Sequence, residues 1–162
     1  GNGFTMVEIV IVVVILSFAA MLAIPMMSGA ASMQLRSAAN MAAGDLEYVK
    51  SLAISRGESF SVEFDASAES YRIVDANGAV MTHPVRAGQD YTVQFAVQSR
   101  LNRVNIASVD FNGTSKVTFD YLGSPHDGSG NPLNTGEVTL QADSATITIS
   151  VEPVTGFISI SK

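Results

Sequence analysis

A largely apolar segment near the start of the chain limits the possible folds more than any other feature. It runs from Phe4 to Ile24, 21 residues in which Glu8 is the one charged side chain. As a helix with a rise of 1.5 Å per residue, this segment is about 32 Å long, close to the hydrocarbon thickness of a bilayer. The helix would be apolar on every side, so it needs lipid or protein all around it. The segment lacks a basic front and contains an acid, so we do not interpret it as a secretory signal peptide.

The apolar segment is expected to continue as a helix beyond Pro25. Pro25 removes one backbone donor, so it should kink or loosen the preceding turn. After it, apolar residues recur at steps of three or four, which places them on one helix face: Leu35, Ala39, Ala42, Leu46, Val49 and Ala53. Gly57 suits the position that follows a helix end. The sequence therefore predicts one long helix from Phe4 to Arg56, apolar in its first half and amphipathic in its second.

After Gly57 the apolar period changes from that of a helix to that of a strand. Phe60, Val62 and Phe64 alternate with polar residues, and several later segments alternate in the same way. The pair Asn77-Gly78 favours a hairpin, and the segment 90–97 is expected to form one strand. We count eight or nine short strands in all. The predicted fold class is α+β, with the amphipathic half of the helix packed on an antiparallel, β-rich head.

Composition excludes several classes of function. The chain has no Cys, so disulfides, thiol catalysis and Cys-ligated zinc are excluded. Its net charge of −6 disfavours a nucleic-acid partner, and Arg100 and Arg103 are interpreted as a solvated strand edge. His83 and His126 stand beside prolines in turn-like segments and are interpreted as solvated loop residues. Neither a nucleophile elbow nor a phosphate-binding loop occurs, so we expect no enzyme and no cofactor.

A long polar loop within the β-rich region is the one candidate metal site. Asp127, Ser129 and Asn131 alternate there, and hard cations use oxygen ligands at such spacing. The acid that closes an EF-hand loop is absent, because residue 138 is Val. Gly, Asp, Ser, Asn and Pro also make up ordinary exposed turns. We therefore expect a surface loop, with calcium binding as the weaker alternative.

The start of the chain resembles a known family. The stretch "GFTMVEIVIVVVILSFAAMLAIP", Gly3 to Pro25, is similar to the N-terminal signature of type IV pilins and of the pseudopilins of type II secretion. In the head, "SLAISRGESFSVEF", "FDYLGSP" and "ITISVEPVTGFISIS" resemble the pseudopilin H and minor pilin T branch. This resemblance implies a pilin-like fold, in which a long N-terminal helix carries a β-rich head.

The resemblance also implies roles for individual residues. Gly3 matches the residue after which a prepilin peptidase cuts, and Phe4 would then be the new N-terminus, commonly N-methylated. Glu8 matches the acidic residue that sets the register of neighbouring subunits, and Pro25 matches the proline that kinks the helix. Residues before Gly3 in this family are usually basic, whereas Gly1-Asn2 is not, which leaves the mature start open.

A physical argument supports a pairing role for Glu8. A lone carboxylate in hydrocarbon costs at least ~2.5 kcal/mol on insertion scales. No Lys or Arg occurs before Arg36, so the cation in reach is an α-amino group, which cleavage after Gly3 would place on Phe4. Pairing with a neighbour's amine would select one stagger between subunits, because every other stagger buries an unpaired charge. The alternative is a carboxylate that reaches the headgroup level beside the helix start.

These observations divide the chain into four parts. Residues 1–3 are expected to be a leader remnant, residues 4–28 a membrane and filament-core helix, residues 29–57 an amphipathic half-helix, and residues 58–162 the head. We expect processing by prepilin peptidase, residence in the inner membrane as a precursor, and then assembly with identical subunits into a periplasmic or extracellular filament. An assembly platform and secretin machinery are the further partners that the resemblance implies.

The first interpretation of function is a major pilin of a type IV pilus. A minor pilin, or a pseudopilin of a type II secretion or DNA-uptake system, is the alternative that the head favours. A membrane-tethered binding module, with the long loop as its ligand surface, is a second alternative of a different class. The number of copies in sheared filaments would separate the three.

Overall fold

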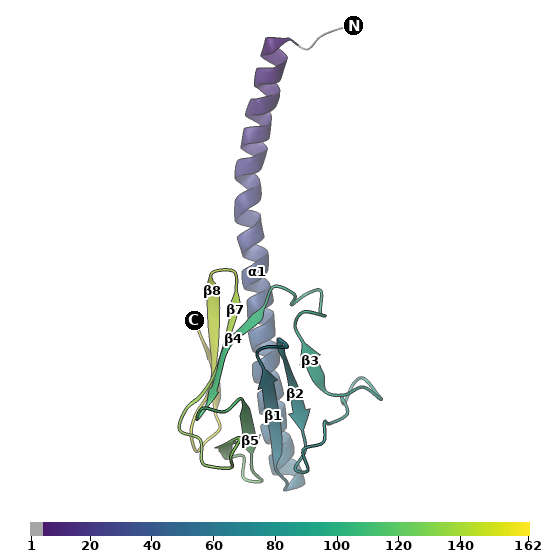
Figure 1. Ribbon diagram of the computed structural model, residues 1–162, viewed down its shortest axis with the longest axis vertical. Helices are drawn as coiled ribbons and strands as arrows, with labels where there is room; N and C mark the ends of the chain where they lie inside the picture. Colours follow the sequence, from purple (N-terminus) through teal and green to yellow (C-terminus); the bar gives the residue numbers. More distant parts are fainter. Residues whose placement is uncertain (1–4) are drawn as a thin grey trace.

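The computed structural model describes residues 5–162, except for the side chains of residues 20–28. Over these residues one helix, α1 (Met6–Arg56), is followed by nine strands. They are β1 (Phe60–Asp65), β2 (Ser70–Val74), β3 (Thr92–Gln94), β4 (Asn105–Phe111), β5 (Lys116–Phe119), β6 (Pro125–Asp127), β7 (Gly136–Ala142), β8 (Ala145–Val151) and β9 (Ile158–Ser161). The first half of α1 projects beyond the head, and the second half lies along it (Figure 1). This confirms the predicted α+β, pilin-like fold.

Local chemistry sets both ends of α1. Thr5 precedes the helix in an extended conformation, and its side chain accepts a hydrogen bond from the Glu8 backbone N–H. Gly57 ends the helix with a φ of 68°, in the left-handed region, and its N–H donates to the Ala53 carbonyl. The predicted helix end at Arg56 is therefore correct. The helix continues through Pro25, while a kink at that residue stays a prediction.

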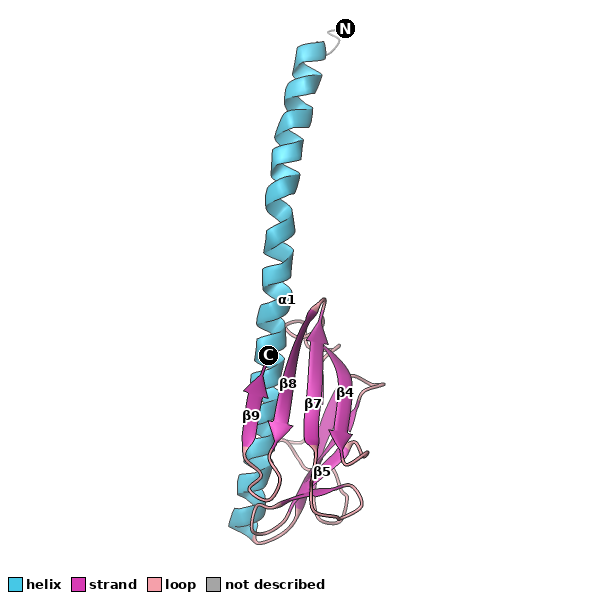
Figure 2. Cartoon of the chain, turned by 90° about the vertical axis from the view of Figure 1, so that its left-hand side faces the viewer, coloured by secondary structure: helices cyan, strands magenta, loops and turns pink. Residues whose placement is uncertain are grey.

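The strands form two antiparallel sheets that lie against the second half of α1. The first has the order β3-β2-β1-β5-β6, and the second has the order β4-β7-β8-β9. Figure 2 shows the second sheet beside the helix, with β9 next to α1 and the C-terminus on the side of the projecting half. The two hairpin turns of β5-β6 and β8-β9 therefore lie at the opposite end of the head, near the last turn of α1.

The core lies between α1 and the two sheets. The predicted helix stripe is buried throughout: Leu35, Ala39, Ala42, Leu46, Val49 and Ala53 are each at most 1% exposed. It packs on inward-facing residues of both sheets, among them Phe60, Val62, Ile73, Val117, Leu140 and Ile149. Among the described residues, burial of apolar side chains begins at Ala31. The hydrophobic core therefore belongs to the head and the amphipathic half of α1.

Three details of the head differ from the sequence prediction. The expected strand over 90–97 is reduced to Thr92–Gln94, and Val97 is exposed. The turn at Asn77-Gly78 forms, but only one bridge, Val74 to Val80, follows it. The hairpin stays short because β3 and the residue before it pair with β2: the Ile73 N–H donates to the Tyr91 carbonyl, and Arg72 pairs with Thr92. The long polar loop is also not continuous, because the edge strand β6 lies within it.

Candidate functional site

The projecting half of α1 is the most unusual surface of the chain. Its large apolar side chains between Met6 and Phe18 are 46% to 86% exposed. Soluble monomers rarely expose contiguous apolar patches of more than a few hundred Å². This surface therefore requires an apolar covering from outside the chain.

Among the residues that the structure describes, no helix meets the length and apolarity needed to cross a membrane.

The helix start contains a capping arrangement that sequence analysis missed. The Thr5 hydroxyl accepts the Glu8 backbone N–H at 3.3 Å, and the Thr5 carbonyl accepts the N–H groups of Glu8 and Ile9 at 3.0 and 3.2 Å. Thr-x-x-Glu is the sequence pattern of a capping box, so the signal was present. A carboxylate in the first turn is also favoured by the helix dipole. Glu8 thus has a local role besides any role in pairing.

The other residues predicted to act in processing and assembly are not placed by the structure. Gly3 and Phe4 lie outside the described residues, and so does the side chain of Pro25. The Glu8 side chain is exposed in the single chain. Its pairing with a Phe4 amine therefore stays a prediction.

A buried polar link fixes α1 to the first sheet. Asp45 on α1 accepts hydrogen bonds from the hydroxyls of Tyr71 and Tyr91, at 2.6 and 2.8 Å. Burial raises the pKa of the Tyr71 phenol well above its ordinary value, and the negative charge of Asp45 raises it further. The pKa of Tyr91 is raised for the same two reasons. These shifts keep both hydroxyls protonated, so that they can donate to Asp45.

Two turns at the far end of the head meet over the last turns of α1. Lys50 donates to the Gly156 carbonyl at 2.9 Å and forms an ion pair with Glu47 at 2.8 Å. A side-chain Cβ at Gly156 would lie 2.7 Å from the Gly123 carbonyl oxygen. The φ of Gly156 is +59°, which other residues rarely adopt. Glycine is therefore required where the β5-β6 and β8-β9 turns touch.

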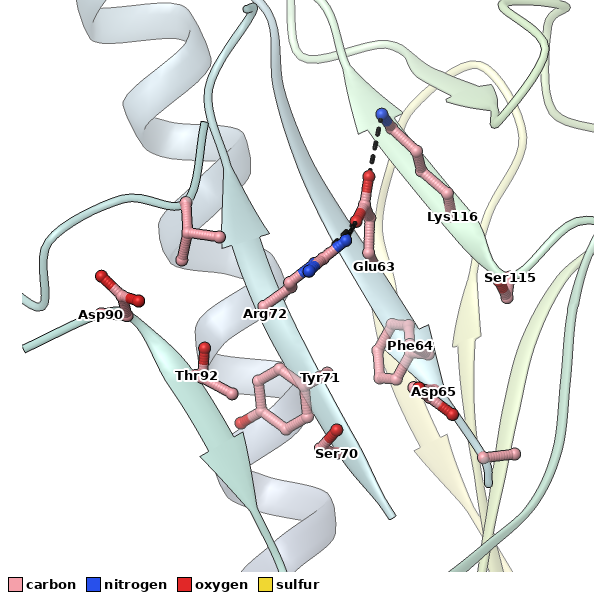
Figure 3. A pocket seen from close by; sticks show the side chains of 12 residues that line it. Glu63, Phe64, Asp65, Ser70, Tyr71, Arg72, Asp90, Thr92, Ser115 and Lys116 are labelled. Carbon is pink, nitrogen blue, oxygen red and sulfur yellow. Dashed lines mark hydrogen bonds and ion pairs between the residues drawn. The ribbon is translucent and has the colours of Figure 1, made fainter. Parts of the chain in front are cut away.

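A shallow hollow of ≈ 630 Å³ lies on the outer face of the first sheet (Figure 3). Glu63 on β1 stands between Arg72 on β2 and Lys116 on β5, with N–O distances of 2.7 and 3.2 Å. Partial burial would raise the pKa of the Glu63 carboxyl, but the hydrogen bonds from both cations outweigh it and hold the pKa below its usual range. Both cations form ion pairs with Glu63. We therefore interpret the hollow as part of a solvated sheet face on which ion pairs link neighbouring strands.

The loop that was weighed as a calcium site is folded around Asp127. One carboxylate oxygen accepts the backbone N–H groups of Ser129 and Asn131, at 2.8 and 2.9 Å. The other accepts the side-chain amides of Asn112 and Asn131, at 3.1 and 3.2 Å. The hydrogen bond from the Asn131 backbone, with those from the amides, lowers the pKa of Asp127 to about 2.

The Asp127 oxygens are thus occupied by donors of the chain itself. Among the described residues, no three His, Cys, Asp or Glu side chains come together in a way that could hold a metal. The loop chemistry of Asp127, Ser129 and Asn131 is that of a structural turn.

The two histidines are less solvated than predicted. His83 is half-buried, its ring lies 4.4 Å from that of Tyr91, and its Nδ1 accepts the backbone N–H groups of Val85 and Arg86. His126 is half-buried on β6. Both imidazoles therefore contribute to local structure.

Comparison with known proteins points to one family. The sequence model of type II transport protein GspH matches residues 38–155. The minor pseudopilin EpsH from the type 2 secretion system of Vibrio cholerae has a similar structure, with a TM-score of 0.56, 8% identity, and coverage of 79% of this chain and 96% of that one. The type IV minor pilin FimU of Pseudomonas aeruginosa aligns with a TM-score of 0.54 and 17% identity, over 81% of this chain and 90% of that one. These two likenesses establish the fold alone, and comparison with curated proteins gave no match.

Proposed function

The chain belongs to the family of type II transport protein GspH, and from this premise we propose that it is a low-copy structural subunit of a type IV pilus-like filament, such as a type II secretion pseudopilus. One observation carries the proposal: a head matched by this family is joined to a helix whose apolar half is exposed. The first interpretation from sequence, a major pilin, is not supported, and the alternative of a minor pilin or pseudopilin fits better. The role is structural, and no catalysis is proposed.

In this proposal the apolar half of α1 has two environments in turn. It is held in the inner membrane before assembly, after prepilin peptidase has cut between Gly3 and Phe4. During assembly it moves into the filament core, where helices of neighbouring pseudopilins replace lipid as its apolar surroundings. The head faces outward, on the periplasmic or extracellular side, because its own core is complete without the apolar half.

Glu8 would set the stagger between neighbouring helices. Its carboxylate lies in an apolar stretch, and the nearest basic side chain in the sequence is Arg36. A neighbour's Phe4 amine at the level of Glu8 would neutralise it, whereas any other stagger would leave the carboxylate unpaired among apolar side chains. The pairing of Glu8 with the amine therefore favours one stagger between neighbouring subunits.

The test compares three substitutions of Glu8. Glu8→Ala and Glu8→Gln remove the negative charge and should lower the share of subunit found in sheared filaments. Glu8→Lys should lower this share most, because it places the lysine ammonium next to the neighbour's Phe4 amine, so that two positive charges repel each other. Total subunit in the membrane should stay near normal for Ala and Gln. Asp90→Asn, an equivalent change on the exposed head, is the matched control.

The Gln variant separates charge from capping. Glutamine serves in a capping box as glutamate does. If Glu8→Gln assembles like wild type while Glu8→Ala does not, capping explains Glu8 and pairing is wrong. If Glu8→Lys gives normal filaments, Glu8 does not register subunits at all.

A further inference from the structure

Basic residues gather at the end of the head from which the projecting half of α1 emerges. Four of the nine basic residues of the chain lie there, all exposed: Arg36, Arg100, Arg103 and Lys162. Arg36 is on α1, the next two are in the loop between β3 and β4, and Lys162 follows β9. Figure 1 shows that the β3-β4 loop lies at this end of the head. We name these four residues the basic collar.

Two contacts place the basic collar on both sides of α1. The Arg103 backbone N–H donates to the Gln34 side chain at 3.2 Å, which holds the β3-β4 loop against the helix. Arg36 and Lys162 line one groove, so the end of β9 adjoins α1 as well. Gln34 and Arg36 flank the buried Leu35, and residues two apart on a helix point to nearly opposite sides. The collar therefore surrounds the helix instead of forming one lateral patch.

The positive charge of the basic collar is not neutralised within the described part of the chain. Among the described residues, no ion pair involves a member of the collar. Of the acids at this end, Asp65 accepts backbone N–H groups of its own turn, and Glu69 accepts a backbone N–H of β4. Asp143, in the β7-β8 turn, is exposed. This end thus keeps an excess of positive charge in a chain whose net charge is −6.

The length of α1 sets the height of the basic collar above a membrane. A hydrocarbon core of about 30 Å holds about 20 helical residues, so a helix that enters it between Met6 and Ile9 leaves it between Pro25 and Ser28. Arg36 then stands about 12–17 Å beyond the core, and the headgroup layer takes about 5–8 Å of this distance. Helical side chains lean towards the N-terminus, which here is towards the membrane. The rest of the gap is within the Debye length, ~10 Å at 0.1 M salt.

We propose that the basic collar binds the anionic headgroups of the membrane that holds α1, and so docks the head on the lipid surface before assembly. The proposal rests on the proposed function, which places the apolar half of α1 in that membrane, and it adds the class of lipid that the head recognises. Three of the four cations are arginines, whose planar guanidinium groups match the oxygens of a lipid phosphate.

The tether makes weak lipid contacts sufficient. Because α1 already holds the head at the surface, docking is an intramolecular step that needs little affinity of its own. Each basic residue near an anionic membrane contributes about fivefold to binding. An acidic protein could use the same cations, but the collar surrounds the helix where it leaves the membrane, and this position favours lipid. A subunit that moves into a filament gives these contacts up.

The test uses full-length protein in nanodiscs of phosphatidylcholine, or of an equal mixture with phosphatidylglycerol, with a quencher on some headgroups. The chain has no Cys, so Asn102→Cys, exposed between the two loop arginines, takes one fluorophore. We expect stronger quenching in the mixture than in phosphatidylcholine alone, and no difference at about 1 M salt, where the Debye length is about 3 Å. A fluorophore on Leu122→Cys, in the β5-β6 turn at the opposite end, should show no difference between the lipids.

Two double variants in the Asn102→Cys background test the collar itself. Arg100→Gln with Arg103→Gln should lower the docking equilibrium constant about 25-fold, at fivefold for each arginine, and should abolish most of the lipid difference. Arg56→Gln with Arg86→Gln removes the same charge from exposed residues outside the collar and is the matched control, which should keep the difference. All four side chains are exposed, so both variants should unfold at the wild-type temperature.

The outcomes separate this proposal from the proposed function. Equal quenching of the Asn102→Cys fluorophore in the two lipids, as an acidic protein partner in place of lipid would give, overturns the proposal. A lipid difference that survives Arg100→Gln with Arg103→Gln, or that the control loses equally, overturns it too. Quenching is measured without filaments, so absence of the chain from sheared filaments contradicts the proposed function and leaves the quenching result as it stands.

Discussion

Asp45→Ala tests the link between α1 and the first sheet. Hydrogen bonds to a charged group contribute about 1.5–3 kcal/mol each, and Asp45 accepts two. The substitution also leaves the Tyr71 hydroxyl buried without its acceptor, since Tyr71 is fully buried. Alanine offsets part of this loss, by up to about 0.7 kcal/mol of helix propensity and by removing a partly buried charge. We expect a net loss of about 2–4 kcal/mol in the free energy of unfolding.

The assay is urea unfolding of a fragment of residues 29–162, followed by circular dichroism. This fragment keeps every buried apolar residue of the described chain, since burial begins at Ala31. It should therefore be a soluble monomer that retains the sheets. Glu47→Ala is the matched control, because this half-exposed carboxylate two residues further on forms an ion pair with Lys50, and such a pair is worth about 0–1 kcal/mol. A loss below about 1 kcal/mol for Asp45→Ala, or one equal to that of Glu47→Ala, would refute the reasoning.

Two extensions isolate the hydrogen bond itself. In a double-mutant cycle with Tyr71→Phe, the coupling energy should be about 1–2 kcal/mol. The raised pKa of Tyr71 also predicts a loss of stability in alkali: above about pH 10 the unfolded phenol ionises first, while the folded phenol stays protonated. The stabilisation is complete below that pH and declines above it. Tyr71→Phe should make that decline shallower.

Three further predictions concern single sites. Gly3→Val should leave an uncut precursor in the membrane, and mass spectrometry of wild-type subunit that begins at Gly1 would contradict the processing site. For fragment 29–162, a chelator should not change the melting temperature. Because the folded state lowers the pKa of Asp127, this carboxylate should stabilise the fragment above about pH 4 and cease to do so as the pH falls to about 2. Asp127→Ala should therefore make the stability of the fragment less dependent on acid pH. Gly156→Ala should lower the free energy of unfolding by at least about 2 kcal/mol, because the added Cβ meets a carbonyl oxygen and the φ is positive. Gly78 also has a positive φ, +79°, but lies in open space, so Gly78→Ala should lower it by about 1–2 kcal/mol in the same urea titration.

The helix and its buried face were predictable because they depend on local rules. A stripe at steps of three and four faces one way on any α-helix, so Leu35 to Ala53 had to point to a common core. Gly57 ends the helix because a residue without Cβ adopts the left-handed conformation at low cost. The alternation of Phe60, Val62 and Phe64 fixed the inward face of β1 for the same kind of reason.

Contacts between distant segments were not predictable from the sequence. Asp45 does not belong to the apolar stripe, so its position in the sequence favours a solvated carboxylate. Only the packing of β2 and of the segment before β3 brings Tyr71 and Tyr91 to it. The loop around Asp127 has the composition of both a turn and a cation site. The sequence does not show that the amide of Asn112, just after β4, reaches Asp127.

The separation of core and apolar half has a consequence for assembly. Because burial among the described residues begins at Ala31, we expect folding of the head not to depend on what surrounds Met6 to Phe18. Under the proposed function, a subunit would fold while its apolar half lies in lipid, and assembly would then exchange lipid for neighbouring helices without refolding the head. Under this scheme substitutions at Asp45 should change stability and assembly together, whereas substitutions at Glu8 should change assembly alone. A Glu8 variant that also lowers the amount of folded head would show that the two halves are coupled.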